Sequence, residues 1–175
     1  MTDRLITRRH FVATSGVTAA TLAAVTSTRA ATGVGDEFTY EINRTDEEWR
    51  AMLSDAEHKI LREGDTELPR TSDLWNEERE GTYRCKGCGL LTYTSNWKVP
   101  LDKGWVFFAH AEPNSVLMDI DGPQQAYGMN PNGIANLIEV HCRRCGSHLG
   151  HILKVDGLVV HCINGQALTF EPAEA

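Results

Sequence analysis

Hydrophobic and polar positions follow different patterns on the two sides of Asn76. Before it, residues 45–48 and 54–57 have the hydroxyl-x-x-Glu spacing of a capping box, so each predicts the start of a short helix. The first helix is expected to run through about Leu53 and the second to end near Gly64. After Asn76, short apolar runs alternate with glycine and proline turns, at residues 81–84, 90–94, 105–109, 115–120 and 137–141. The pattern predicts a mainly β, mostly antiparallel domain with short N-terminal helices.

The last two apolar runs, residues 152–155 and 158–162, are separated only by Asp156-Gly157. Asp-Gly is a strong signal for a two-residue hairpin turn, because both central positions need a positive φ. Directly opposed residues of such a hairpin share one face of the sheet, with Cβ atoms about 4.5–5.5 Å apart. The turn predicts three facing pairs: Val155 with Leu158, Leu153 with Val160, and His151 with Cys162.

His151 and Cys162 are the pair in this hairpin that can carry chemistry. An imidazole beside a thiol can lower the pKa of that thiol and can supply or take a proton. The alternative is a structural pair, with Cys162 as a buried small apolar residue and His151 as a hydrogen-bonded strand residue. A slip of one residue in the register would place the two on opposite faces.

The first thirty residues have the pattern of a bacterial twin-arginine signal peptide. Arg8-Arg9 precede the aromatic Phe11, a weakly apolar run follows to Val25, and Thr28-Arg29-Ala30 offers small residues for cleavage after Ala30. A transmembrane anchor is the alternative, but the run is short and rich in threonine. We expect a signal peptide at 1–30, a flexible leader at 31–43, one domain at 44–172, and export to the periplasm.

The net charge of the exported domain limits the kinds of partner that it can bind. The chain has 175 residues and a formal charge of −7, and removing 1–30, with four arginines and one aspartate, leaves −10. A domain this acidic is a poor ligand for nucleic acid or an anionic membrane surface. We therefore expect that it binds no nucleic acid and does not insert stably into a membrane. We also expect a monomer. Twin-arginine export carries folded proteins, which suits a domain that must load a metal first.

Four of the five cysteines form two C-x-x-C-G motifs. Both thiolates of a motif can reach one ion, and four thiolates close the tetrahedron of a structural zinc site with no open catalytic position. Two disulfides are the alternative in an exported protein, although a C-x-x-C disulfide closes a tight, strained ring. A bound zinc can contribute on the order of 10 kcal/mol to folding. The expected ligands are Cys85, Cys88, Cys142 and Cys145.

Cys162 is the odd cysteine, and in an exported chain it is either an intermolecular bridge or a reactive thiol. His151 faces it in the predicted hairpin, and Asn164 lies two residues on, on the same face. His148 precedes His151 by one short turn. One of the two imidazoles can act as an acid while the other is oriented by it.

With these motifs the chain resembles the B-type methionine-R-sulfoxide reductases, the MsrB family. The resemblance covers about residues 44–170, and the combination of motifs is highly specific although no single motif is. It rests on the segments at 45–49, 61–69, 81–89, 104–105, 127–129, 139–145, 148–151 and 162–164. It implies a zinc-containing antiparallel β-sandwich or barrel of the Mss4-like type, and an oxidoreductase that acts on methionine-R-sulfoxide, free or in oxidised proteins.

The resemblance also implies roles for the candidate residues. Cys162 is the nucleophile that attacks the sulfoxide sulfur and becomes a sulfenic acid. His148 or His151 protonates the oxygen, and Asn164 orients the imidazoles or the substrate. The Trp105 indole forms the wall that receives the methyl group on the sulfoxide sulfur; without the resemblance, Trp105 is ordinary core packing.

Four features depart from the family pattern. Val160 replaces an arginine that helps to form the thiolate, and His161, whose side chain should point to the other face, replaces a common tyrosine. Residues 105–108 are Trp-Val-Phe-Phe instead of Trp-Pro-Ser-Phe. Asp102 and Lys103 stand where many members carry a resolving cysteine. With the other cysteines on zinc, no internal disulfide can form, so the enzyme needs an external thiol reductant, thioredoxin-like or other.

Two other functions remain open from the sequence. One is a degenerate zinc-stabilised β module that binds a partner or methionine-rich ligand with little catalytic activity, which Val160 and the altered aromatic segment favour. The other is a peroxidase-like use of Cys162. The intact set of candidate site residues favours the reductase.

Overall fold

The computed structural model describes residues 38–123 and 136–174. The expected signal peptide at 1–30, the first part of the expected leader at 31–43 and the motif at 127–129 lie outside the described residues. Within the described part, no helix combines the length and apolar character needed to cross a membrane.

Both predicted helices form where the capping boxes place them. α1 spans Asp46–Met52 and α2 spans Asp55–Glu63. Each helix has both reciprocal hydrogen bonds of its capping box, and in α2 these join Ser54 and Glu57. α2 ends at Gly64, whose left-handed backbone, with a φ of 75°, satisfies the end of the helix. Local polar signals therefore set the bounds of this N-terminal region.

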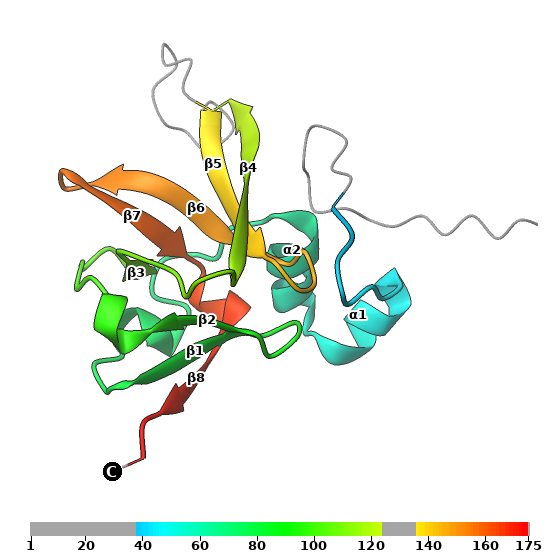
Figure 1. Ribbon diagram of the computed structural model, residues 1–175, viewed down its shortest axis with the longest axis horizontal. Coiled ribbons are helices and arrows are strands. Elements are labelled where there is room, and N and C mark those ends of the chain that lie inside the picture. The colour runs from blue at the N-terminus through cyan, green and yellow to red at the C-terminus, as the bar shows by residue number, and fades with distance from the viewer. Residues whose placement is uncertain (1–37, 124–135, 175) are drawn as a thin grey trace, which may run out of the picture.

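The strands form two antiparallel sheets. They are β1 Gly81–Cys85, β2 Leu91–Thr94, β3 Val106–Phe108, β4 Val116–Pro123, β5 Asn136–Cys142, β6 His148–Val155, β7 Leu158–Ile163 and β8 Leu168–Pro172. The smaller sheet has the order β2-β1-β8 and the larger has the order β3-β7-β6-β5-β4. Figure 1 shows α1 and α2 on one side of the sheets and the tip of the β6–β7 hairpin on the other. The predicted mainly β, antiparallel fold is confirmed.

Three kinds of element differ from the predicted set. β8 adds a strand, because its short run gains its pairing from β1 rather than from a local turn. β6 begins at His148, ahead of the apolar run that predicts it. Short 3₁₀ helices also occur, since a single turn leaves no periodic signal; they are η1 Asp73–Asn76, η2 Ser95–Trp97 and η4 Gly165–Ala167.

The β6–β7 hairpin has the predicted turn and register. Asp156 and Gly157 both have a positive φ, 48° and 88° respectively. The pairs follow as expected: Val155 with Leu158, Leu153 with Val160, and His151 with Cys162. The two-residue turn thus sets the alignment of the candidate nucleophile with an imidazole.

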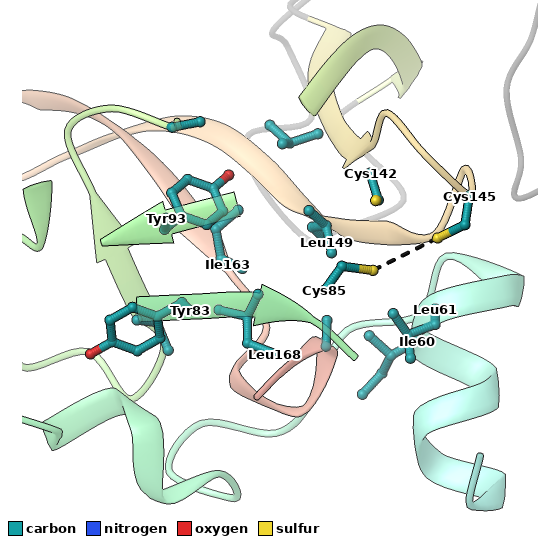
Figure 2. Close-up of a cluster of buried hydrophobic side chains, with 14 of the residues drawn as sticks. Ile60, Leu61, Tyr83, Cys85, Tyr93, Cys142, Cys145, Leu149, Ile163 and Leu168 are labelled. Carbon is teal, nitrogen blue, oxygen red and sulfur yellow. Dashed lines mark hydrogen bonds between the residues drawn. The ribbon is translucent and has the colours of Figure 1, made fainter. Parts of the chain in front are cut away.

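Buried apolar side chains join the two sheets to the helices. Figure 2 shows Tyr83 and Leu168 of the smaller sheet, Leu149 and Ile163 of the larger sheet, and Leu61 of α2 in one cluster. Fully burying a large apolar side chain contributes about 1.5–3 kcal/mol. Because Leu149 follows His148 and Ile163 follows Cys162, the core holds the backbone on which the candidate site residues stand.

Candidate active site

Cys162 lies on β7 in a row of residues that crosses the larger sheet. It pairs with Phe107 on β3 and with His151 on β6, and His151 pairs in turn with Glu139 on β5. Residues paired across antiparallel strands point to the same face. The structure therefore brings the predicted nucleophile and His151 together, and it adds a buried glutamate to the row.

A bulge in β6 brings the second imidazole into the site. His148 and His151 are three positions apart, so in a regular strand they would point to opposite faces. The pairing of β5 with β6 shifts register between Val140 and His141, which leaves Leu149 as an extra residue. The extra residue reverses the alternation. The two imidazole rings consequently lie 5.1 Å apart, centroid to centroid.

Gly150 permits this geometry beside the nucleophile. A Cβ at this position would lie 2.1 Å from the carbonyl oxygen of Cys162 and 2.9 Å from Cα of Ile163. Both are backbone atoms, which cannot move aside as the end of a flexible side chain can. Only glycine therefore fits at position 150, directly before His151.

Each imidazole has its own carboxylate. Nδ1 of His148 lies 2.6 Å from Oε1 of Glu139, and Nε2 of His151 lies 2.9 Å from Oδ2 of Asp121. Because an ionised carboxylate only accepts, these two ring nitrogens carry the protons. Nε2 of His148 is buried and has no hydrogen-bond partner within the described residues. It is therefore the ring atom of His148 that is left for a further hydrogen bond.

Burial dominates the electrostatics of the site. It raises the pKa of Cys162 to about 12, and the negative charge of Glu67 acts in the same direction. Burial also lowers the pKa of His151, against the opposing effect of Asp121. At pH 7 the site therefore holds a neutral thiol and a neutral His151 imidazole, and not a preformed thiolate.

Asn164 and Trp105 meet at the backbone of Glu67. Oδ1 of Asn164 accepts from the Glu67 N–H at 3.1 Å, and Nε1 of Trp105 donates to the Glu67 carbonyl at 3.2 Å. Nδ2 of Asn164 donates to the carbonyl of Leu149, the residue after His148. Asn164 is therefore tied to the backbone of β6 between the two candidate imidazoles.

The residues that depart from the family pattern each have identifiable neighbours in the structure. Val160 shares the face of Cys162 by strand alternation and is only 2% exposed, so an apolar side chain fills the place of the arginine. Nδ1 of His161 lies 3.1 Å from the hydroxyl of Tyr93, on the opposite face as predicted. Lys103 forms an ion pair at 3.1 Å with the aspartate of the β6–β7 turn.

The other four cysteines converge at a separate centre. Their four Sγ atoms lie within 4.8 Å of one another. Sγ of Cys85 is 3.7 Å from that of Cys145, and Sγ of Cys88 is 3.5 Å from that of Cys142. A disulfide bond is about 2.05 Å long, whereas zinc–sulfur distances of about 2.3 Å give a tetrahedron edge of about 3.8 Å. The all-sulfur donor set and its spacing fit zinc, and all five cysteines are free thiols.

Two similar turns place these thiols. The N–H of Gly89 donates to the carbonyl of Cys85 at 2.7 Å, and that of Gly146 donates to the carbonyl of Cys142 at 2.9 Å. Both glycines have a positive φ, the left-handed conformation that glycine adopts without strain. Figure 2 shows Cys85 at the end of β1 and Cys142 at the end of β5, with Cys145 in the turn that follows. The centre therefore ties the two sheets together.

Arg62 of α2 supplies positive charge to this centre. One guanidinium nitrogen donates to the carbonyl of Cys145 at 3.1 Å and to the Ser147 hydroxyl at 3.2 Å. The guanidinium also lies 4.6 Å from the centre of the Trp49 ring. Burial lowers the pKa of Arg62, and the charges of Cys145 and Cys85 oppose this. A cluster of four thiolates around one divalent ion carries net negative charge, which this cation offsets.

Three acidic residues of the site were not predicted from the sequence. Glu139 and Asp121 orient the imidazoles, and Glu67 joins Trp105 to Asn164. Glu139 had a usable signal, because it is a charge between apolar neighbours on a strand. Glu67 had none, since its partners lie far along the chain.

Comparisons with known proteins agree with one family. A protein-family model described as the SelR domain matches residues 53–172. Peptide methionine sulfoxide reductase B3 of Arabidopsis thaliana is 36% identical over 137 residues, which are 75% of this chain and 72% of that protein. Peptide methionine sulfoxide reductase MsrB of Agrobacterium fabrum is 34% identical over 137 residues, 75% of this chain and 94% of that protein. The solved Mis18 'Yippee-like' domain aligns with 55% of this chain, and all of that domain, at a TM-score of 0.45 and 18% identity, too distant to bear on the site.

The match over residues 53–172 places the chain among SelR-domain proteins, and the converging four cysteines are consistent with this class. It belongs to the family of MsrB-type peptide methionine sulfoxide reductases. The family resemblance predicted from the motifs is confirmed. The roles of single residues are not tested by these comparisons, and they are argued below as a proposal.

Proposed function

We propose that this protein reduces methionine-R-sulfoxide, free or in oxidised proteins, with Cys162 as the nucleophile. The single observation that best supports this is the pairing of Cys162 with His151, in a row that also holds Glu139. Family membership indicates the substrate class. The site adds one isolated thiol and two imidazoles with bound carboxylates, which suit attack on a sulfoxide and protonation of its oxygen.

In the first step the sulfur of Cys162 attacks the sulfoxide sulfur and forms an S–S bond, while the thiol proton passes through the imidazoles to the oxygen. The resulting OH group then moves from the substrate sulfur to the Cys162 sulfur, so the substrate S–O bond and the new S–S bond both break. Methionine leaves, and Cys162 is left as a sulfenic acid. The cysteine sulfur is oxidised by two electrons and the substrate sulfur is reduced by two, so this step needs no other reductant.

The raised pKa of Cys162 is compatible with this step. The proton that leaves the thiol is the proton that the oxygen requires. Neutral His151 can accept it as the sulfur attacks, and Nε2 of His148, which has no other partner within the described residues, can donate to the oxygen once it carries a proton. Asp121 and Glu139 then stabilise the positive charge that forms on the imidazoles. Asn164 holds the imidazole backbone, and the Trp105 indole receives the methyl group.

Return of the thiol requires an external reductant. The sulfenic acid condenses with one thiol to give a mixed disulfide and water. A second thiol then releases the Cys162 thiol and a disulfide. Because the other four cysteines converge at the metal centre, we assign a one-cysteine mechanism, with a thioredoxin-like protein or a small thiol as donor.

The proposed metal at the four-cysteine centre is one structural zinc per chain. Cys85, Cys88, Cys142 and Cys145 would hold it, and a closed four-sulfur shell supplies a cross-link rather than a reactive water. The contribution is to stability, because this centre joins β1 to β5. The Cys162 reaction therefore runs through the chain's own thiol and imidazoles.

Export is a separate part of the proposal. Residues 1–30 would act as a twin-arginine signal and residues 31–43 as a leader to the 44–172 domain, which would work in the periplasm. Replacing Arg8 and Arg9 together by lysine should retain the unprocessed chain in the cytoplasm, as cell fractionation would show. Normal export of that double variant would contradict this part and leave the reductase proposal unaffected.

A non-catalytic zinc-stabilised binding module is the second candidate. It is favoured by the apolar Val160 next to a thiol whose pKa is raised to about 12. Such a thiol would react slowly with alkylating reagents and with substrate. The two candidates differ in whether substrate is turned over.

The test is an assay of the zinc-loaded 31–175 protein on the separate R and S epimers of a peptide methionine sulfoxide, with dithiothreitol as donor. Consumption of the R epimer alone supports the proposal. Without donor, one methionine should form per chain, and one sulfenic acid should be trapped at Cys162 by mass spectrometry. Turnover of neither epimer would contradict the proposal and favour the binding module.

A further inference from the structure

Glu67 is a buried carboxylate that the proposed mechanism does not use. It lies in the segment between α2 and η1 and is 5% exposed. Acidic side chains are rarely buried unless their oxygens are bonded. The bonds of Glu67 therefore indicate what it holds in place.

Both carboxylate oxygens bind the loop that follows the nucleophile. The Gly165 N–H donates to Oε1 at 2.6 Å, and the Gln166 N–H donates to Oε2 at 3.0 Å. These amides begin η4, where backbone N–H groups lack partners within the helix. Asn164 is the cap residue, but its own side chain makes no cap bond. The carboxylate of Glu67, which is distant in the sequence, therefore caps η4 in place of the Asn164 side chain.

The main chain of Glu67 extends the same connection. Its N–H donates to Oδ1 of Asn164, and its carbonyl accepts from Nε1 of Trp105. Trp105 precedes β3, and Asn164 follows β7, the strand that carries Cys162. One residue thus joins the indole assigned to the substrate wall to the segment assigned to the nucleophile.

The charge of Glu67 also acts on the thiol. Together with burial it raises the pKa of Cys162. The titratable groups on the same sheet face are His151 and His148 from β6 and Glu139 from β5, with Asp121 of β4 bonded to His151. Phe107, which pairs with Cys162 from β3, is uncharged. For Glu67 itself, burial raises the carboxyl pKa, whereas the amides of Gln166 and Gly165 and the charge of Lys86 lower it.

We infer that Glu67 is a positioning residue for the reaction assigned to Cys162, because it holds Trp105 and the Asn164 segment in one arrangement around the thiol. This inference rests on the proposed function. It predicts that removing the carboxylate has two effects of opposite sign. The site loses its alignment, so catalysis slows, while the thiol loses a nearby negative charge and becomes more acidic.

The experiment compares Glu67→Gln, Glu67→Asp and a control, Glu57→Gln. Gln keeps one accepting oxygen but turns its NH₂ toward a backbone N–H, so kcat/KM on the R epimer should fall about 10- to 100-fold, with KM raised. If the variant merely contained less correctly folded protein, kcat would fall and KM would stay unchanged. The alkylation rate of Cys162 should meanwhile rise, with its pH profile shifted to lower pH.

Glu67→Asp keeps the charge and shortens the reach. It should keep the wild-type alkylation profile and lose part of kcat/KM. Glu57 is a capping carboxylate of α2 that accepts from the Ser54 N–H at 2.9 Å. Its Gln variant should lower the melting temperature slightly and leave both the alkylation profile and KM unchanged.

Hydrogen exchange separates failure of this inference from failure of the proposed function. In Glu67→Gln the amide of Gln166 should exchange faster, whether or not the protein turns over sulfoxide. A wild type inactive on both epimers overturns the function alone. A Glu67→Gln protein with wild-type KM, alkylation profile and Gln166 exchange overturns the positioning role.

Discussion

The five cysteines of this chain occupy two regions with opposite electrostatic surroundings. At the four-cysteine centre the thiols face one another, and the Arg62 guanidinium donates to the Cys145 carbonyl. At the other region the single Cys162 thiol lies on a buried sheet face with Val160 and Phe107, and its charged neighbour is the carboxylate of Glu67. The second region favours the neutral thiol, whereas the first would hold thiolates when a metal ion is bound.

The difference shows that the surroundings, and not the residue type, decide what a cysteine does. A nearby cation stabilises thiolates, and thiolates are the form of cysteine that binds a metal ion. Four converging sulfurs beside a cation therefore favour metal binding. An isolated thiol in an apolar setting keeps its proton until a substrate brings an acceptor for it. The following predictions test this contrast.

The largest effect is expected at the metal centre. Cys88→Ser removes one of four ligands, so the free energy of unfolding should fall by a large part of the roughly 10 kcal/mol that structural zinc can supply. The protein should lose its metal and its cooperative melting transition, as metal analysis and calorimetry would show. A folded, metal-free Cys88→Ser protein would contradict the structural role.

Cys162→Ser should have the reverse outcome. The hydroxyl cannot replace the nucleophile, so reduction of the R epimer should fall by about 10³-fold or more, as is usual when a catalytic nucleophile is removed. Zinc content and melting temperature should remain as in the wild type, because Cys162 makes no contribution to the metal centre. Retained turnover would move the nucleophile to another residue.

Arg62→Met should weaken zinc retention while keeping the fold. The side chain keeps most of its apolar contact with Trp49 but loses the cation and the bonds to Cys145 and Ser147. Residues that support metal ligands contribute about 10- to 100-fold to affinity. Zinc release to a chromogenic chelator should accelerate accordingly. Arg50→Met, an exposed arginine of α1, is the control and should release zinc at the wild-type rate.

Val160→Arg should make the second region resemble the first. A cation about 4–6 Å from a thiol lowers its pKa by about 1–3 units, so Cys162 alkylation at pH 8 should accelerate about tenfold or more. The sign follows from the raised pKa of Cys162, to about 12, which keeps the thiolate scarce at that pH. Burying an arginine should also lower the melting temperature.

Val159→Arg is the matched control for that change. Val159 directly precedes Val160 on β7, is 68% exposed and points to the opposite face. The same charge there should leave the alkylation rate unchanged within about twofold, since exposed charges are screened by water and salt. Equal acceleration in both variants would mean that the face assignment of β7 is wrong.

Local signals in the sequence determined several features of this protein. The two capping boxes set the bounds of α1 and α2, and Asp156-Gly157 set the register that pairs His151 with Cys162. The two C-x-x-C-G motifs predicted that their four cysteines meet at one centre. In the capping boxes and the hairpin, the interacting residues lie within a few positions of one another or across one short turn. Their interaction can therefore be predicted from the sequence without knowledge of the fold.

Only the tertiary structure decided the rest of the site. The bulge at Leu149, the carboxylates of Glu139 and Asp121, and the contacts of Glu67 join segments from different strands and loops. So does β8, which exists because β1 offers it an edge. Such contacts form when distant segments pack against a shared core, and burial then shifts the pKa of Cys162 upward. The spacing of residues in the sequence does not indicate that burial. The protonation state of the thiol could therefore be inferred only from the folded chain.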